Sequence, residues 1–350
     1  MPSWATRDLR PGEGRDLPRE MTLPIFYPWT DGPRRRGTGM WRYLKGVEHG
    51  LGLARLLRSE ARRRADIVHF QWAVLPMLDR LAIGRLRRTC PVVLTVHDVT
   101  PFNGRDVPLA QRRGFAQVLD SVDRMIVHTP GARDALAAAG HAPARIDLVP
   151  HGLLRLPPGV RERGDGRWRI VQFGRIQHYK GVDLLLEALG TLDAATRARL
   201  EIVVAGEPMV ETGPLLARAS ELGLEGIVDF RFGHLSEGAM AELLASADAF
   251  VFPYRTIEAS GVLFLVASLG RWIVASDRGA FPDLLGRDGA AGALVDPEDP
   301  TRLAEALQAS IGLTPRRSIV ADVPSWEEIG RMTRAVYERA LADRGQRRRG

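Results

Sequence analysis

The chain has 350 residues, 45% of them hydrophobic and 26% charged, which is a globular composition of a length typical of two domains. The one cysteine, Cys90, excludes an internal disulfide and is typical of a reducing compartment. The sequence shows neither the apolar core of a signal peptide nor an apolar run of about 18 residues, so we expect a cytoplasmic protein.

Positive charge is concentrated in a few segments. The net charge is +7, from 49 Lys and Arg against 42 Asp and Glu, and the excess lies mainly in residues 33–64 and in the tail "DRGQRRRG". Such patches bind nucleic acid, anionic lipid headgroups or phosphorylated ligands, whereas an arginine-rich coding bias gives the same composition without a ligand. Because no zinc-ligand spacing, RNA-binding aromatic signature or helix-turn-helix glycine pattern is present, we expect no nucleic-acid partner.

Residues 1–40 are rich in Pro, Gly and Arg and are predicted to be irregular, with one apolar patch, "LPIFYPW". From residue 41 on, apolar runs alternate with helical patterns. Strands are predicted at 65–72, 91–98, 124–129 and 145–152, with helices that end near Arg88, span 110–121 and cover "PGARDALAAAG". The β-branched residues run continuously instead of alternating, which indicates strands buried on both faces of a parallel sheet.

A linker at 154–167, rich in proline, glycine and charge, separates this part from a second one with the same rhythm. Its predicted strands are 169–174, 201–205, 228–232, 249–253, 272–276 and 293–296, and its helices lie near 182–190, 213–223, 236–246, 261–270 and 301–311. A last helix is predicted at 325–343.

Alternating strands and helices build right-handed βαβ units. We therefore predict an α/β protein of two Rossmann-like doubly wound domains, residues 41–155 and 156–322, that face a central cleft. The irregular segment 1–40 precedes them, and a helix with a basic tail, 323–350, follows.

The stretch "VQFGRIQHYKGVDLLLEAL" (171–189) places two cations between a strand and a helix. Ligands of doubly wound folds bind outside the carboxyl ends of the strands. Gly174 allows a close backbone turn, and Arg175 and Lys180 can clamp a diphosphate there. A surface loop with two solvated cations is the alternative. Since neither a Walker loop nor a G-x-G-x-x-G fingerprint is present, NTP hydrolysis and nicotinamide binding are disfavoured.

A second strand-to-helix turn lies in "FPYRTIEASGVLFLVASLG" (252–270). Glu258 can accept hydrogen bonds from sugar hydroxyls, and the N–H groups of Gly261, Val262 and Leu263 would open the helix toward a polar or anionic ligand. Alternatively, Glu258 and Ser260 cap this helix, a role that is compatible with ligand binding.

Taken together, "FGRIQHYKGVDLLLEAL", "VVAGEP" and "ELLASADAFVFPYRTIEASGVLFLVASLGRWIVAS" resemble the family 4 retaining glycosyltransferases of GT-B architecture. The resemblance covers residues 66–340 and is strongest over 169–285. It implies that the first domain receives the acceptor and that the second binds a nucleotide-sugar donor.

The resemblance also assigns roles to particular residues. Arg175 and Lys180 would hold the diphosphate, and Glu258 would bind hydroxyls of the donor sugar. The backbone of 261–263 would contact the sugar and the phosphate, and Gly174 and Ser260 complete the predicted donor site.

His97, in "VLTVHDVTPF", matches a family position where histidine contacts the donor sugar and its phosphate, and we expect Asp98 to orient its imidazole. The predicted catalytic set is therefore His97, Arg175, Lys180 and Glu258. For His69, His128 and His151, which also lie near strand ends, a structural role is predicted.

The sequence departs from the family pattern in two places. The family has Glu-x7-Glu, and the second of these positions is Val266 here, which cannot accept hydrogen bonds from a ribose. The first buried strand comes at residue 65, about one βα unit early. Either "LPIFYPW" is what remains of an earlier unit, or the start of the gene is set too late.

The resemblance implies transfer of a hexose from a UDP- or GDP-linked sugar to a glycan or lipid-linked acceptor, in polysaccharide or glycolipid biosynthesis. No carboxylate pair is placed like that of a glycosidase, which favours front-face retaining transfer, and we expect neither a metal nor a cofactor. The alternatives are a non-catalytic or divergent GT-B sugar-nucleotide binding protein and a GT-B epimerase or phosphorylase.

The basic segment 33–64 has a second possible partner. Trp41, Tyr43 and a stripe of leucines allow peripheral contact with the inner face of an anionic membrane. The stripe consists of Leu51, Leu53, Leu56 and Leu57. Alternatively, these residues form an ordinary helix that packs on its own sheet.

Overall fold

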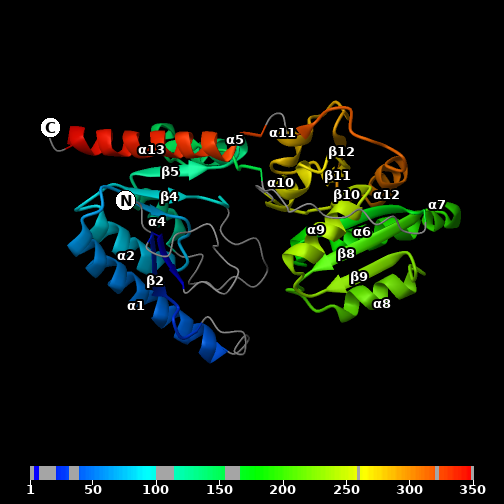
Figure 1. Ribbon diagram of the computed structural model, residues 1–350, viewed down its shortest axis with the longest axis horizontal. Helices are drawn as coiled ribbons and strands as arrows, with labels where there is room; N and C mark the ends of the chain where they lie inside the picture. Colours follow the sequence, from blue (N-terminus) through cyan, green and yellow to red (C-terminus); the bar gives the residue numbers. More distant parts are fainter. Residues whose placement is uncertain are drawn as a thin grey trace.

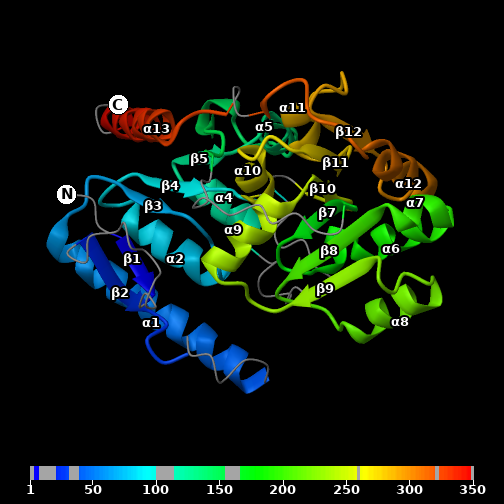
Figure 2. The ribbon, with the colours of Figure 1, turned by 45° about the vertical axis from the view of Figure 1, so that its right-hand side comes forward.

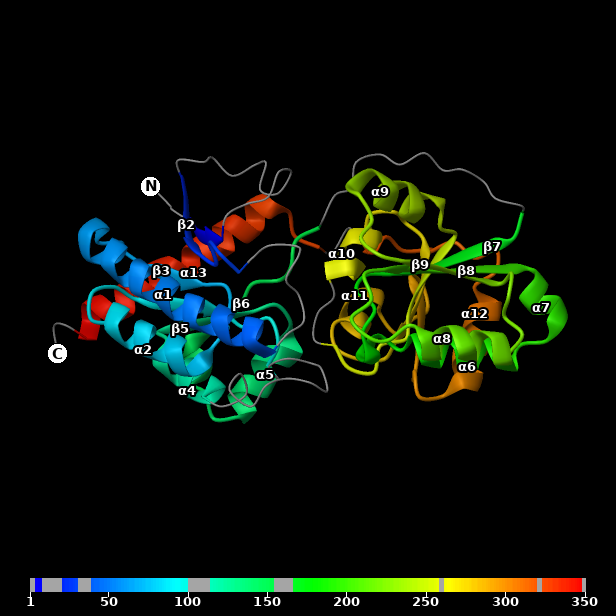
Figure 3. The same cartoon turned by 90° about the horizontal axis from the view of Figure 1, so that it is seen from below.

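The computed structural model describes residues 4–7, 21–30, 39–99, 114–153, 166–257, 261–319 and 323–347. Their strands form parallel sheets of two, four and six strands (Figure 1). The four-stranded and six-stranded sheets belong to two α/β domains that lie side by side (Figure 3). The predicted fold class is therefore confirmed, while the predicted boundaries at 155 and 322 lie outside the described residues.

The sheet of the first domain has the order β3-β4-β5-β6. Its strands are β3 (Val68–Phe70), β4 (Val92–Thr95), β5 (Arg124–Val127) and β6 (Ile146–Leu148). The helices of this domain are α1 (Gly39–Arg63), α2 (Pro76–Leu86), α4 (Phe115–Ser121) and α5 (Pro130–Ala138). Every residue of β4 and β5 is buried, as expected for a parallel sheet covered on both faces.

The sheet of the second domain has the order β12-β11-β10-β7-β8-β9, so the strand order reverses between β7 and β10. Its strands are β7 (Trp168–Phe173), β8 (Leu200–Gly206), β9 (Val228–Phe232), β10 (Ala249–Phe252), β11 (Trp272–Ser276) and β12 (Gly292–Val295). The helices are α6 (Val182–Thr191), α7 (Ala194–Ala198), α8 (Gly213–Glu221), α9 (Glu237–Ser246), α10 (Gly261–Ala267), α11 (Phe281–Leu285) and α12 (Pro300–Ala309).

The prediction of an irregular segment at 1–40 is wrong for two short stretches. β1 (Trp4–Arg7) and β2 (Thr22–Phe26) pair in parallel, and β2 includes the first residues, "LPIF", of the patch "LPIFYPW". A buried polar chain fixes the turn that follows β2, because the hydroxyl of Tyr27 and Nδ1 of His49 are 2.7 Å apart and Nε2 of His49 lies 2.7 Å from Asp79. Hydrogen bonds to groups on α1 and α2 therefore anchor a segment whose composition suggests disorder.

The last helix, α13 (Trp326–Arg347), returns to the first domain, where it lies along β4 and β5 (Figure 2). Val336 and Ala340 of α13 have no exposed surface and pack with Val93 and Ile126 of the sheet. The helix thus supplies a layer that the first domain would otherwise lack on that face.

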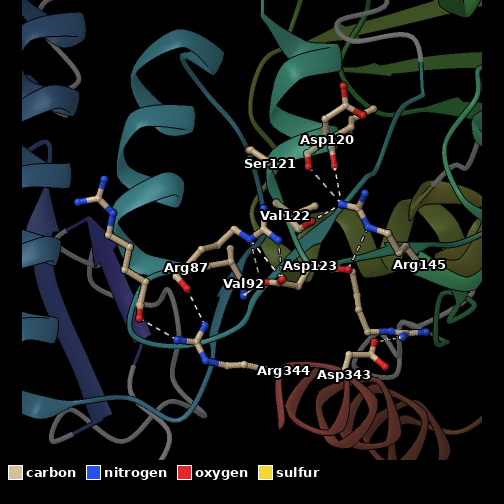
Figure 4. A network of polar contacts seen from close by, with 12 residues as sticks. Arg87, Val92, Asp120, Ser121, Val122, Asp123, Arg145, Asp343 and Arg344 are labelled. Atoms are coloured by element: carbon tan, nitrogen blue, oxygen red, sulfur yellow. Dashed lines mark hydrogen bonds and ion pairs between the residues drawn. The ribbon is translucent and has the colours of Figure 1, made fainter. Parts of the chain in front are cut away.

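Ion pairs and hydrogen bonds hold α13 along its length. The guanidinium of Arg124, on β5, pairs with Asp147 at 2.7 Å and with Asp343 of α13 at 2.8 Å, and Arg339 adds a second contact to Asp147 at 2.8 Å. Further along, Arg344 donates to the carbonyl oxygens of Arg87 and of the next residue, beside the Arg87–Asp123 pair (Figure 4). Hydrogen bonds and ion pairs of arginines on both α13 and β5 therefore hold α13 on the first domain.

Removal of one buried carboxylate tests this anchoring. We expect Asp147→Ala to lower the free energy of unfolding by about 3 kcal/mol, because among the described carboxylates it leaves the buried guanidinium of Arg124 only the half-exposed Asp343. Asp134→Ala, which removes an exposed pair with Arg133, is the matched control and should cost less than about 1 kcal/mol. Urea unfolding followed by circular dichroism measures both, and equal losses in the two variants would contradict the anchoring role.

Candidate functional site

The predicted donor site lies at the carboxyl ends of β7 and β10, which are neighbours in the sheet. The strand order reverses between these two strands, and the loops that leave them therefore run in opposite directions. A crevice between such loops is where doubly wound sheets bind their ligands.

Gly174, directly after β7, lets three predicted site residues meet. Its φ is +117°, and a Cβ atom at this position would lie 2.6 Å from Nζ of Lys180 and 3.1 Å from Cγ2 of Val262. Any side chain here would displace the ammonium group of Lys180 and strain the backbone. The structure thus brings together the end of β7, Lys180 and the first turn of α10.

Lys180 is a buried cation. Only 7% of its surface is exposed, its ammonium lies 5.2 Å from the centre of the Tyr254 ring, and its carbonyl accepts a 2.7 Å hydrogen bond from Gln172. Burial, and secondarily the charge of Arg175, lowers the pKa of Lys180 to about 8. Within the described part of the chain, no carboxylate pairs with Lys180 or with the exposed Arg175. Two cations at a topological switch point, without a carboxylate partner among the described residues, favour a bound anion.

An ion pair and a backbone hydrogen bond join the loop after β10 to the turn after β7. The guanidinium of Arg255 contacts both carboxylate oxygens of Asp183 at 2.8 and 2.7 Å, and its backbone N–H donates to Tyr179 at 2.8 Å. Gly181 has a φ of +65°, and a Cβ atom there would overlap the carbonyl oxygen of Pro253. These contacts fix the chain just before Glu258, although Glu258 and Ser260 themselves lie outside the described residues.

The first residues of α10 do not share one environment. Val262 faces Gly174, whereas the side chain of Leu263 is completely buried in the core of the second domain. Val266 is 1% exposed and belongs to the same apolar cluster. The position of the second family carboxylate is therefore a core position in this chain.

His97, two residues beyond β4, lies at the edge of the first sheet. Its ring stacks on Trp72 at 4.3 Å between ring centres, and burial, followed by the neighbouring His128, lowers its pKa to about 4. The pKa of Tyr179, in the turn after β7, is raised by burial and then by the charge of Asp98. The expectation that Asp98 orients the imidazole is wrong for the described side chains, because Nδ1 of His97 contacts His128 instead, at 3.3 Å.

A row of rings continues from His97 into the second domain. The ring centres of His97 and His128 are 5.0 Å apart, those of His128 and His151 are 5.8 Å apart, and His151 stacks on Phe264 of α10 at 4.8 Å. In Figure 3, α10 lies on the side of the second domain that faces the first. His69 contacts Tyr337 and Thr95 at 2.8 Å each, in agreement with the structural role predicted for it.

Sequence reasoning missed several residues of this site. Tyr254 lies against the Lys180 ammonium, Gln172 holds the backbone of Lys180, and Trp72 stacks on His97. The aromatic residue that follows Pro253 at the end of a buried strand was the one signal available. The other two depend on strand pairing and domain packing, which a motif does not contain.

Two doubly wound domains, with Arg175 and Lys180 at the topological switch point of the second, fit the GT-B architecture that the resemblance implies. The model of the family described as Glycosyltransferase Family 4 matches residues 9–153, and that of Glycosyl transferases group 1 matches residues 167–312. The chain therefore belongs to the group 1, family 4 glycosyltransferases, as the resemblance predicted.

Relatives over most of the chain support this assignment. A D-inositol 3-phosphate glycosyltransferase of Mycolicibacterium vanbaalenii is 31% identical over 336 residues, which cover 85% of this chain and 72% of the relative. An MMP alpha-(1->4)-mannosyltransferase of Mycolicibacterium hassiacum is 32% identical over 318 residues, 82% of this chain and 74% of the relative.

Solved structures share the fold. Sucrose-phosphate synthase from Thermosynechococcus elongatus superposes with a TM-score of 0.70 at 18% identity, over 89% of this chain and 82% of that one. Anabaena HepE in complex with UDP-glucose gives a TM-score of 0.65 at 15% identity, over 87% of this chain and 90% of that one.

The lowered pKa of Lys180 predicts how anion binding depends on pH. A bound diphosphate favours the charged ammonium, so affinity should be greatest below pH 8 and should fall as the pH rises through the free-state value of about 8. The nucleotide phosphate, whose second pKa is about 6, keeps a constant charge in that range. We expect Lys180→Met to bind weakly and with little pH dependence. Calorimetric titration with UDP and GDP between pH 7 and pH 9.5 measures this, and an unchanged pH profile in Lys180→Met would refute it.

Proposed function

We propose that the protein transfers a hexose from a UDP- or GDP-linked sugar to a glycan or lipid-linked acceptor, in polysaccharide or glycolipid biosynthesis. The observation that carries this proposal is the buried ammonium of Lys180, which lies beside Gly174 and the first turn of α10 and has no carboxylate partner among the described residues. A diphosphate would supply the missing negative charge.

The relatives support the same kind of reaction. One is named for inositol 3-phosphate, another for mannosyl transfer, and one structural neighbour holds UDP-glucose. Two of these names state transfer of a glycosyl group, and the third states a bound sugar nucleotide. We place the acceptor on the first domain, and the donor at Arg175 and Lys180 of the second.

We infer a front-face retaining reaction that needs no metal ion. The bond between the sugar and the β-phosphate breaks with positive charge growing on the sugar and negative charge on the phosphate. Arg175 and Lys180 would stabilise the leaving phosphate, and one preorganised contact of this kind is worth about 3–4 kcal/mol. The departing phosphate would then accept the proton of the attacking hydroxyl, and Glu258 would hold hydroxyls of the donor sugar.

Ligand-induced stabilisation tests the donor site. We expect one nucleotide, UDP or GDP, and its hexose conjugates to raise the melting temperature of the protein, and Lys180→Met to abolish this shift. Lys45→Met, which changes the chain's other lysine, on α1 of the first domain, is the matched control and should respond as the wild type does. Incubation with the stabilising sugar nucleotide and candidate acceptors then gives the product by mass spectrometry. Stabilisation that persists in Lys180→Met would place the phosphate elsewhere.

We further propose that the first domain contacts an anionic membrane, although through a different set of residues than the sequence suggests. Leu53 and Leu56 are only 4% and 7% exposed, so the predicted leucine stripe belongs mainly to the core. The exposed apolar residues of α1 and of the adjacent α2 are Met40, Tyr43, Leu44, Val47, Leu51, Met77, Leu78 and Leu81.

Cations accompany this apolar face. Lys45 and Arg58 on α1, and Arg80 and Arg85 on α2, are exposed, and α1 and α2 pack side by side (Figure 1). An apolar surface with cations around it fits anionic lipid headgroups, and each cation near such a surface contributes about 1 kcal/mol. None of the helices in the described ranges has the length and apolar character of a membrane span. The contact that we propose is a peripheral one.

Vesicle sedimentation tests this surface. We expect the protein to sediment with vesicles that contain phosphatidylglycerol, to remain in the supernatant with neutral vesicles or in high salt, and to lose binding in Leu51→Glu. Leu216→Glu on α8 of the second domain is the matched control, since Leu51 and Leu216 are 44% and 47% exposed. Equal binding to neutral and anionic vesicles would contradict the proposal.

A further inference from the structure

The hydrogen bonds of His128 determine where its proton lies. Nδ1 of His128 is 2.8 Å from the carbonyl oxygen of Val149. A carbonyl oxygen can only accept, so Nδ1 of His128 carries the hydrogen. Burial lowers the pKa of His128, and the neutral ring therefore presents a lone pair at Nε2.

The tautomer of His97 follows from that of His128. Nδ1 of His97 lies 3.3 Å from Nε2 of His128, so Nδ1 of His97 is the donor of this hydrogen bond. The neutral His97 ring then has its lone pair at Nε2. The reverse arrangement would set a lone pair of His128 against the carbonyl oxygen of Val149, which is repulsive.

Nε2 of His97 is buried and has no hydrogen-bond partner among the described residues. The ring itself cannot turn freely, because it is stacked on Trp72 on one side and meets His128 on the other. A buried acceptor without a donor is costly unless a ligand supplies one.

We propose that His128 is a positioning residue that fixes the tautomer of His97, so that Nε2 of His97 accepts a hydrogen bond from a hydroxyl of the donor sugar. The sugar part of this statement rests on the proposed function, whereas the tautomer does not. Phosphate oxygens on a fully ionised diphosphate only accept, and the lone pair of Nε2 would repel them. His97 is therefore assigned to a sugar hydroxyl, and the phosphate is left to Arg175 and Lys180.

Nitrogen-15 NMR of the histidine side chains at pH 7.5 tests the tautomer without any ligand. We expect His97, assigned by comparison with His97→Gln, to carry its proton on Nδ1. In His128→Phe, which keeps an aromatic ring and removes the acceptor, the proton should shift toward Nε2. In His128→Gln the side-chain oxygen can accept from His97, and the wild-type tautomer should return. A proton on Nε2 of His97 in the wild type, or a tautomer unchanged in His128→Phe, would overturn the proposal.

Kinetics test the contact with the sugar. We expect His128→Phe to reduce kcat/KM for the donor about tenfold, with partial rescue in His128→Gln, as for the loss of one hydrogen bond to a hydroxyl. His141→Phe replaces another buried histidine, outside the row of rings, and should leave kcat/KM unchanged. A donor that lacks the contacted hydroxyl should be used equally by wild type and His128→Phe.

The two parts of the proposal fail separately. A confirmed tautomer with unchanged kinetics in His128→Phe would overturn the hydroxyl contact. Titration of the same variant with UDP and GDP shows whether the phosphate site is intact, and a wild type that binds neither nucleotide would instead refute the proposed function.

Discussion

A buried ammonium group without a carboxylate partner among the described residues is the constraint on which the second domain's site depends. Lys180 fits only because Gly174 leaves room for its Nζ atom and the face of Tyr254 lines its other side. Two of the 49 basic residues in this chain are lysines, so the lysine here does not follow from an arginine-rich composition. A compact ammonium fits a space that a planar guanidinium, with its five donors, would overfill.

The site also depends on how the two domains are joined. The stacking of His151 on Phe264 crosses the domain boundary, and Trp326, at the start of α13, donates a hydrogen bond of 2.6 Å to the carbonyl of Leu153 close to it in the chain. Beyond Trp326, α13 lies on the first sheet and is held there by the Arg124 and Arg344 contacts. A movement that separated the two domains would therefore have to break the contact of His151 with Phe264 or turn about the start of α13.

The sheets could be predicted from the sequence because continuous β-branched runs have few alternative structures. β1 and β2 could not, since tertiary hydrogen bonds hold them in a segment of disordered composition. On α1 the predicted leucines and the exposed stripe share only Leu51, because the neighbours of a helix, and not its periodicity alone, decide which face is covered.

Within the site, the contact of His97 with His128 could not be predicted from the sequence either. β4 and β5 pair in a register that places Thr95 beside Ile126, and two residues further along this register His97 comes beside His128. The two histidines are 31 residues apart in the chain, and only strand register makes them neighbours. The motif contains His97, which would contact the ligand, but not His128, which fixes the position of the proton on His97.

At Val266 the site differs from the family pattern. Its side chain packs in the apolar cluster of the second domain, where a carboxylate would lose its hydration without gaining a partner. The affinity that the second family carboxylate would provide has to come from other groups. The cations at Arg175 and Lys180 and the lone pair at Nε2 of His97 suit the diphosphate and the sugar, so these parts of the donor, more than its ribose, would determine binding in this chain.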